Sequence, residues 1–241
     1  MNLSKPIFVL TSDQDWAPAW AVESFLQATI GIPVHMFRTN PCPVADNAFA
    51  TGKITQGWHP NLLPNSSHGS NQEEIVNYML KNFPNCNTAR CHTYLTNTHF
   101  DKLLFESGVK ADSQLATLHQ ENLYPLNDIS GITRFPVFFE DDVFFRLKAP
   151  NLELKSMIKH MFSPGLKIFN LHPTFIACNT PSEEHYSEFR DKIFNSLTPN
   201  PSVVFQGKGS ASIFREIKEL VLENGYSFSC FQNIVDELPK L

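Results

Sequence analysis

Short apolar segments alternate with longer segments of helical periodicity along this chain, and this alternation constrains the fold more than any other feature of the sequence. Apolar strands separated by helices are typical of repeated βα units around a parallel sheet. The strand-like segments are residues 7–11, 33–37, 54–59, 89–95, 109–115, 132–139, 166–171 and 226–231. The helix-like segments are residues 20–30, 73–82, 99–107, 152–162, 183–194 and 212–224. Seven or eight strands in this alternation predict an α/β barrel.

The length of the chain and its loops predict a single domain. The chain has 241 residues, a normal size for one α/β barrel. The most linker-like segments are the polar loop 61–71 and the Pro-containing segment 198–202, and both are too short to separate domains. We therefore expect one domain over residues 1–241.

Composition argues against several classes of protein. The chain has 19 basic and 24 acidic side chains, whereas nucleic-acid binding requires a clustered basic excess. No apolar run approaches the roughly 20 residues of a membrane span, and the apolar stretch at 7–10 is too short for a signal peptide. The five cysteines form no CxxC motif, and their odd number favours a reducing compartment. We expect a cytoplasmic, soluble protein without a membrane span.

Polar residues follow five of the predicted strands, which is where the chemistry of a parallel barrel is found. Nine histidines and 24 carboxylates supply enough metal ligands if some of them converge. The strand-end motifs are Thr-Ser-Asp-Gln-Asp-Trp at 11–16, Trp-His-Pro-Asn at 58–61, Arg-Cys-His at 90–92, Glu-Asp-Asp at 140–142 and Asn-Leu-His-Pro at 170–173. Together they predict a polar pocket at one face of the barrel.

Each motif taken singly also has a structural interpretation. Asp13 and Asp15 could be loop carboxylates or helix N-caps, or both could point into a pocket beside a cation. His59 could be a surface loop histidine. His172 lies beside an apolar strand and could be a hydrogen-bonded core histidine.

The remaining two motifs suggest a partnership. Arg90 and His92 share one face if their segment is a strand, and the structural alternative is a surface pair. The acids at 140–142 lie between two Phe-Phe pairs, where adjacent carboxylates repel each other unless an arginine or a metal compensates. Arg90 is the expected partner of these acids.

As an ordered set, the motifs resemble the NodB-type polysaccharide deacetylases (the carbohydrate esterase family four superfamily), and more closely the WbmS-like branch found in bacterial surface-polysaccharide gene neighbourhoods. The resemblance spans nearly the whole chain. Its residues are TSDQDWAP at 11–18, HPN at 59–61, RCH at 90–92, ADS at 111–113, FPVFFEDD at 135–142 and PGLKIFNLHP at 164–173.

The resemblance implies a distorted (β/α)7-type barrel that holds a divalent metal, commonly zinc. By position in the family's motifs, Asp13 corresponds to the general base and Asp15 to a metal ligand. His59 corresponds to the first metal histidine and His172 to the general acid.

The family's arginine and aspartate motifs, which orient the base, correspond to Arg90 and to Asp141 or Asp142.

Two positions depart from the family's usual pattern. Gln14 separates two aspartates that are usually adjacent, although other members of the superfamily also have Asp-x-Asp. Leu63 stands where the second metal histidine is expected, so a third ligand must come from elsewhere. We predict His92 for this role, with His68 as the fallback. The other histidines, at 35, 99, 119, 160 and 185, are assigned to surface or packing roles.

The predicted activity is metal-assisted hydrolysis of the acetamide of an N-acetylated sugar or polysaccharide precursor. One alternative is a non-catalytic sugar-binding barrel with a vestigial metal site, and another is hydrolysis of a cyclic or formyl amide. Trp16 could stack on a sugar at the rim or serve in packing. The loops 61–71 and 116–131 carry no motif that specifies a sugar, and the sequence makes no prediction of oligomeric state.

Overall fold

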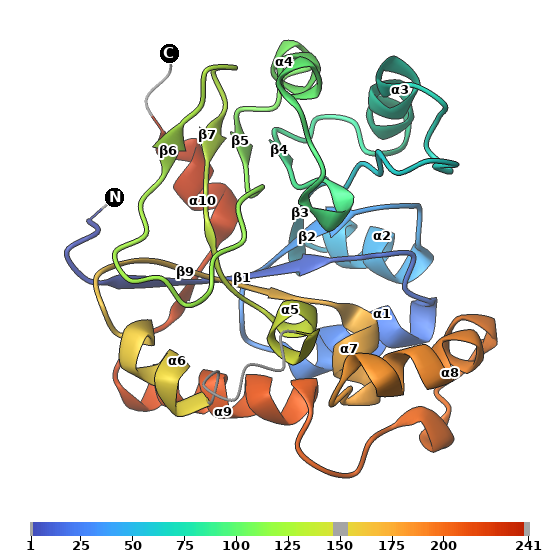
Figure 1. Cartoon of the computed structure of the whole chain (residues 1–241), viewed down its shortest axis with the longest axis vertical. Helices are drawn as coiled ribbons and strands as arrows, with labels where there is room; N and C mark the ends of the chain where they lie inside the picture. The colour runs from blue at the N-terminus through green and yellow to red at the C-terminus, as the bar shows by residue number, and fades with distance from the viewer. Residues whose placement is uncertain (1, 147–153, 239–241) are drawn as a thin grey trace.

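A computed structural model of the chain describes residues 2–146 and 154–238 (Figure 1). Its strands form one curled sheet in the order β6-β7-β5-β4-β3-β2-β1-β9-β8, with β10 beside β1. All neighbouring strands are parallel except β6 and β7. The strands are β1 (Pro6–Asp13), β2 (Val34–Arg38), β3 (Ile54–Trp58), β4 (Thr88–Ala89), β5 (Ala111–Asp112), β6 (Leu126–Asn127), β7 (Thr133–Arg134), β8 (Val137–Glu140), β9 (Gly165–Leu171) and β10 (Phe228–Ser229).

Residues 133–140 join the two ends of the curled sheet. Their first part, β7, pairs with β5, and their last part, β8, pairs with β9. A further parallel bridge links Ala116 to Val137. Pro136 separates β7 from β8 because proline has no N–H to donate to a ladder. The sheet is thus a curled, distorted barrel, which confirms the (β/α)7-type fold expected from the sequence.

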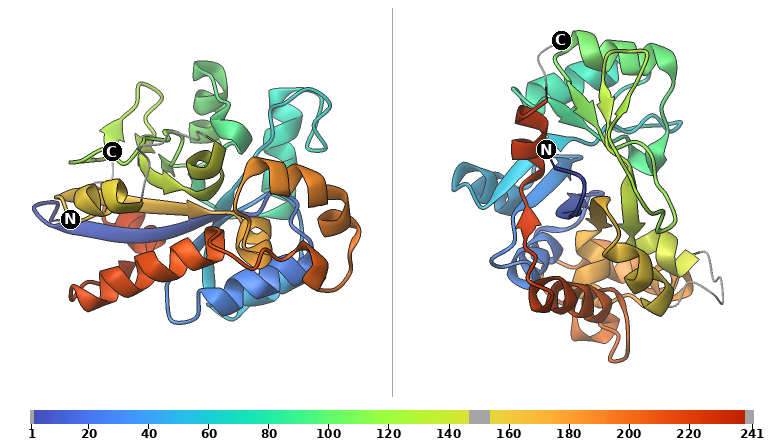
Figure 2. Two further views of the ribbon diagram at one scale, coloured as in Figure 1. Left: turned by 60° about the horizontal axis from the view of Figure 1, so that its bottom comes forward. Right: turned by 90° about the vertical axis from the view of Figure 1, so that its left-hand side faces the viewer.

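Helices cover the outside of the sheet, with α1, α7 and α9 on one side of β1 and β9 (Figures 1 and 2). Asn71, Asn97 and Ser182 cap α3, α4 and α8, because each side chain accepts a hydrogen bond from a backbone N–H of the first helical turn. The helices are α1 (Ala19–Ala28), α2 (Pro43–Ala50), α3 (Gln72–Asn82), α4 (Thr98–Glu106), α5 (Asp141–Arg146), α6 (Leu154–Met161), α7 (Pro173–Cys178), α8 (Glu183–Asn195), α9 (Ser210–Glu223) and α10 (Phe231–Asp236), with 3-10 turns η1 (His92–Tyr94) and η2 (Pro201–Val203).

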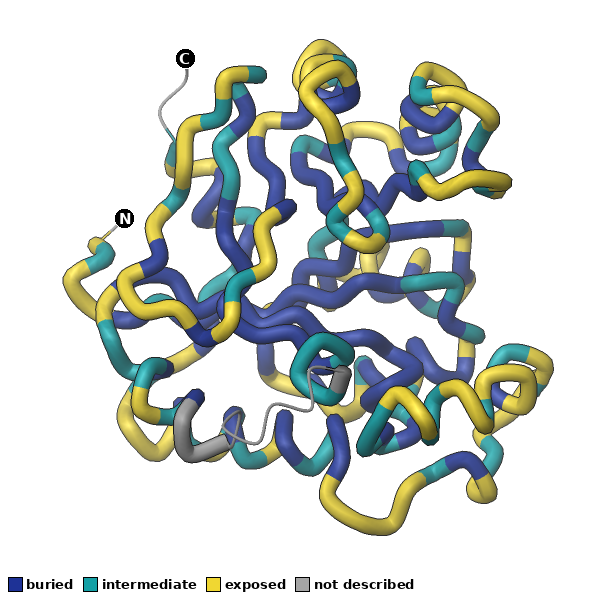
Figure 3. Tube along the Cα trace, viewed as in Figure 1, coloured by how far each residue is buried: buried dark blue, intermediate teal, exposed yellow. Residues whose placement is uncertain are grey.

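The core fills the barrel and the space beneath its helices, so most strands are buried, while β6 and the outer faces of the helices are exposed (Figure 3). Inside the barrel, the Phe37 ring lies under the Arg90 guanidinium, 4.4 Å from its carbon. The Phe231 ring lies 6.2 Å from that of Phe37. The Arg90 guanidinium therefore rests on packed aromatic rings, which help to fix its position.

The predicted elements differ from the observed ones at several places. The strand expected at 89–95 is only β4 followed by η1, where Thr93 and Tyr94 adopt positive φ and cannot continue a ladder. The strand expected at 109–115 is reduced to β5, and the one at 226–231 ends early because α10 begins at Phe231. Helices α2, α5, α7 and α10 were not predicted. Positions 152–153 of the expected helix 152–162 lie outside the described residues.

The five cysteines are unpaired, and four of them are buried, as expected for small hydrophobic side chains. None of the helices in the described part of the chain has both the length and the apolar character that crossing a bilayer requires.

Candidate active site

Most of the predicted site residues line one cavity of about 600 Å³ at the carboxyl ends of the strands, whereas Arg90 and Asp141 lie behind them and do not line it. Asp13 ends β1, His59 follows β3, Glu140 ends β8 and His172 follows β9. Because parallel strands end at the same face of a barrel, side chains far apart in the sequence become neighbours there. Asp13, Asp15, His59, His92, Asp142 and His172 all line this cavity.

Asp15 lies between two histidines. Its Oδ1 is 2.9 Å from His59 Nε2 and 3.0 Å from His92 Nδ1. The Asp15 backbone has a φ of 47°, which turns the chain sharply after β1, and its N–H donates to Thr39 Oγ1. Burial disfavours the charged form of Asp15, but hydrogen bonds from His59 and His92 outweigh it and lower the pKa of Asp15 well below its usual value. The predicted ligand trio is therefore assembled in space.

His68, the fallback ligand, is not part of this trio. Its Nδ1 accepts a hydrogen bond from the Asn61 backbone N–H at 3.1 Å. Its ring stacks on Tyr78 at 4.4 Å and tilts against Trp16 at 5.7 Å. The groups of described residues that could hold a metal include His92 and omit His68. The geometry favours His92 over His68 as the third ligand.

Asp13 is held by a cation and an amide. Arg90 Nη1 donates to its Oδ1 at 2.9 Å, and Asn170 Nδ2 donates to its Oδ2 at 2.8 Å. Burial raises the pKa of Asp13, but the charge of Arg90, with those of His59 and His172, outweighs burial and leaves the pKa below its usual value. Asp13 is therefore an ionised carboxylate at neutral pH, fixed in orientation beside the trio.

The predicted pairing of Arg90 with Asp141 or Asp142 is wrong. Besides Asp13 and Asn170, the buried guanidinium donates to Thr11 Oγ1, Ser113 Oγ and the Ser113 backbone oxygen. These contacts occupy all five N–H groups of Arg90. Asp141 and Asp142 lie in the first turn of α5, where the helix N-terminus favours negative charge. Asp141 pairs with His172, and Glu140 accepts a hydrogen bond from Tyr94.

Asp141 instead holds His172. Its Oδ2 accepts the His172 backbone N–H at 3.0 Å, and its Oδ1 lies 2.7 Å from His172 Nδ1. Burial lowers the pKa of His172, but the Asp141 charge and hydrogen bond outweigh burial and raise it well above its usual value. His172 Nε2 faces Asp15, 3.4 Å from its Oδ2. The protonated His172 ring thus directs Nε2 toward Asp15 of the ligand trio, while Nδ1 on the other side of the ring faces Asp141.

Sequence reasoning missed a network beside Asp13. The Tyr94 hydroxyl donates to Glu140 at 2.6 Å, and Asn170 Nδ2 is shared between Glu140 and Asp13. Burial, followed by the nearby Asp142 charge, raises the pKa of Glu140 to about 8, so its carboxyl group is mostly protonated at neutral pH. Side chains alternate between the two faces of a strand, so Asn170 and His172 lie on the same face at the end of β9. This spacing could have predicted that Asn170 belongs to the site.

Residues 10–190 match the family model of the WbmS-like polysaccharide deacetylases. The chain belongs to this family. The match covers well over half of the chain and agrees with the resemblance of its ordered motifs.

Of two similar solved structures, the first shows the same fold. It is a Bordetella bronchiseptica protein described as a polysaccharide deacetylase involved in O-antigen biosynthesis, with a TM-score of 0.77 and 22% identity over 87% of this chain and 88% of that chain. Another is a family 4 carbohydrate esterase from Streptomyces lividans in complex with acetate, with a TM-score of 0.48 and 12% identity over 92% of this chain and 91% of that chain. A comparison with curated proteins gives no match.

In this WbmS-like polysaccharide deacetylase, the residue inserted between the two aspartates points away from the cavity. Gln14 Oε1 accepts from Arg38 Nε at 2.9 Å. The buried Arg38 also donates to Gln56 at 3.1 Å and pairs with Asp46 at 2.6 Å. The insertion therefore anchors the turn that carries Asp15 to the barrel wall rather than disrupting it.

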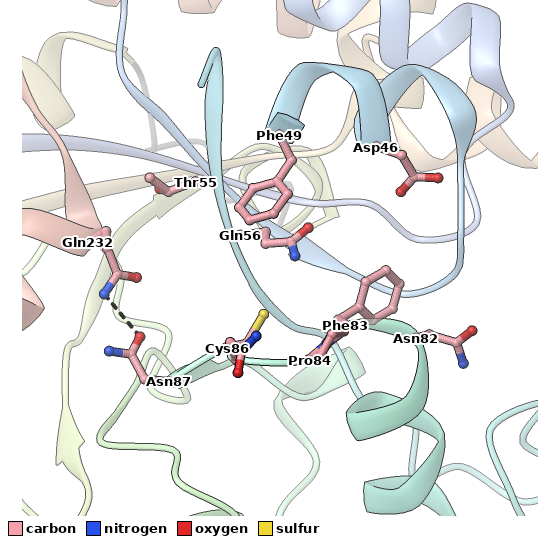
Figure 4. A pocket seen from close by; sticks show the side chains of 11 residues that line it. Asp46, Phe49, Thr55, Gln56, Asn82, Phe83, Pro84, Cys86, Asn87 and Gln232 are labelled. Carbon is pink, nitrogen blue, oxygen red and sulfur yellow. Dashed lines mark hydrogen bonds between the residues drawn. The ribbon is translucent and has the colours of Figure 1, made fainter. Parts of the chain in front are cut away.

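A second cavity of about 470 Å³ lies beyond Arg38, between α2, β3 and residues 82–87 (Figure 4). Amide side chains and Phe49 line it, and Gln232 Nε2 donates to Asn87 Oδ1 on its wall. None of the predicted site residues lines this cavity, so the candidate chemistry belongs to the cavity at the strand ends.

Proposed function

We propose that this chain is a metal-dependent hydrolase that removes the acetyl group from an N-acetylated sugar or polysaccharide precursor. The supporting observation is the convergence of Asp15, His59 and His92 between Asp13 on one side and His172 on the other. Membership of the polysaccharide deacetylase family supports the substrate class.

The donor set of the trio fits a divalent metal. One carboxylate oxygen and two imidazole nitrogens lie within 4.8 Å of one another and line an open cavity, which matches the three protein ligands of catalytic zinc sites. When bound, such a metal supplies Lewis-acid chemistry that polarises an amide carbonyl and lowers the pKa of water.

Asp13 is the proposed general base. Arg90 and Asn170 keep it ionised and oriented, and each of its oxygens retains a free lone pair. Its Oδ1 lies 3.7 Å from His59 Nδ1, so it borders the trio without belonging to it. Asp13 is therefore placed to accept a proton from a water molecule near His59.

His172 is the proposed general acid. Asp141 keeps the ring protonated and directs Nε2 into the cavity. Cleavage of an amide requires a proton on the departing nitrogen, and His172 Nε2 is placed to donate it. Asp13 and His172 thus carry out opposite proton transfers from two sides of one cavity.

The unpaired cysteines support a reducing compartment, so a cytoplasmic location is part of this proposal.

Acetate release tests the proposed activity. The purified chain is incubated with N-acetylated monosaccharides, oligosaccharides and sugar nucleotides, with and without a chelator, and zinc is then added back. We expect acetate release that the chelator abolishes and zinc restores, and no release by Asp13→Asn. A metal-free protein that binds these sugars without hydrolysis would instead identify a sugar-binding barrel. Release of formate, or ring opening of a cyclic amide, would change the substrate.

A further inference from the structure

One face of α8 forms a wall of the active-site cavity. Four of its lining residues, Glu183, Tyr186, Arg190 and Phe194, are spaced three or four positions apart and so form one stripe along the helix. Ser182 caps the helix by accepting the His185 backbone N–H, which fixes where the helix begins. The side chains of this stripe therefore face whatever molecule fills the cavity.

Among the described residues that line this cavity, Arg190 is the only lysine or arginine. The other charged lining residues are acids, apart from the histidines. Arg190 is exposed, and no carboxylate pairs with it in the described part of the chain. A guanidinium that has no carboxylate partner can bind an anion, because its planar N–H fork matches carboxylate and phosphate oxygens.

Tyr186 connects Arg190 to the reacting end of the cavity. Its ring packs on Phe175 at 4.9 Å, and the Phe175 ring lies 5.7 Å from that of His172. Burial, followed by the nearby Asp15 carboxylate, raises the pKa of the Tyr186 hydroxyl, while His172 and Arg190 oppose this rise. Tyr186 and Arg190 are four residues apart on α8 and line the same cavity as Asp15, so a ligand reaching from Asp15 to Arg190 passes beside Tyr186.

We propose that the α8 wall selects an N-acylated sugar that also carries an anionic group, with Arg190 binding the anion. The shared ligand chemistry is a carboxylate on the sugar ring or a phosphate attached to it. This inference rests on the proposed function for the reaction at the acyl group, but the charge preference of the cavity is measurable without hydrolysis.

Direct binding tests the proposal. Asp13→Asn serves as the hydrolysis-blocked background, and calorimetry compares N-acetylglucosamine, an N-acetylhexosaminuronic acid and N-acetylglucosamine 1-phosphate. We expect one or both anionic probes to bind at least tenfold more tightly than the neutral sugar, and the tighter of the two identifies the anion. Added Arg190→Gln should remove this preference, and Arg190→Lys should retain part of it.

Lys192→Gln is the matched control, because it removes a positive charge from the same helix at an exposed residue that does not line the cavity. It should leave all three affinities unchanged. The proposal is overturned by equal affinity for neutral and anionic probes, by absence of binding to all three, or by an Arg190→Gln change that weakens every probe equally. Failure of acetate release with a retained charge preference would overturn only the proposed reaction.

Discussion

Asp141 contacts His172 at two points: it accepts the backbone N–H at 3.0 Å, and its Oδ1 lies 2.7 Å from Nδ1 of the ring. These two contacts fix the ring and leave Nε2 as the atom that faces the cavity. The sequence predicted that Asp141 or Asp142 pairs with Arg90 and so orients the general base, Asp13. In the structure Asp141 instead orients His172, the proposed general acid.

Removing the charge at Asp141 should change the pH dependence of the reaction. The carboxylate favours protonated His172, so Asp141→Asn lowers the pKa of the ring, and its acid form is lost at lower pH. The alkaline limb of the kcat profile should therefore move to lower pH. His172→Ala should lower kcat by about 10²–10⁴-fold. An unmoved limb in Asp141→Asn, or wild-type kcat in His172→Ala, would make His172 a structural histidine.

Metal content should depend on His59 and His92 and not on His68. His59→Ala and His92→Ala each remove a proposed ligand, so affinity should fall by more than the roughly 10–100-fold cost of losing an outer-sphere partner. Elemental analysis and metal titration measure this. His68→Ala is the matched control and should retain metal. Full retention in both ligand variants would refute the assignment.

Asp13→Asn should separate catalysis from metal binding. The amide cannot accept the proton that an ionised carboxylate accepts, so kcat should fall by at least about 10²-fold. Metal stoichiometry should stay at the wild-type level, because Asp13 borders the trio without belonging to it. Loss of the metal in this variant would show that Asp13 is a ligand rather than a base.

Gln14→Ala should weaken metal binding at a distance. It leaves the buried Arg38 Nε without its acceptor, at a stability cost of about 1–3 kcal/mol, and frees the turn before Asp15. Gln56→Ala is the matched control: it also removes an acceptor of Arg38, but Gln56 lies on β3 and not between Asp13 and Asp15. Urea unfolding should show a loss for both variants, larger for Gln14→Ala because its oxygen also accepts the Thr39 N–H, whereas metal titration should show weakening only for Gln14→Ala. Equal metal affinities in the two variants would contradict the positioning role.

His35 should make the fold sensitive to acid. Burial, reinforced by the Arg90 charge, lowers the pKa of His35 to about 3. The unfolded chain therefore binds a proton that the folded chain does not, and stability falls as pH drops from about 6.5 toward 3. Between pH 7 and 4.5 this loss is roughly 3 kcal/mol. Urea unfolding of His35→Gln should show a smaller loss over the same interval, and an equal loss would contradict this assignment.

Local patterns were sufficient for much of the barrel. The apolar run at 166–171 is β9, and the helix expected at 73–82 is α3, which Asn71 caps. Both features depend on a few adjacent residues, so the sequence predicts them well. The prediction failed at 89–95, where contacts of Arg90 and His92 with distant segments replace the strand by a turn.

The sequence by itself determined most of the alternation of strands and helices and which residues stand at the carboxyl ends of the strands, because apolar periodicity is local. Only the tertiary structure decided which of those residues touch. Barrel curvature and strand register brought Arg90 to Asp13, His172 to Asp141 and His92 to Asp15. The tertiary structure also placed Arg190 on the wall of the active-site cavity. Such pairings depend on the directions of side chains from separate strands and helices, and no local pattern encodes those directions.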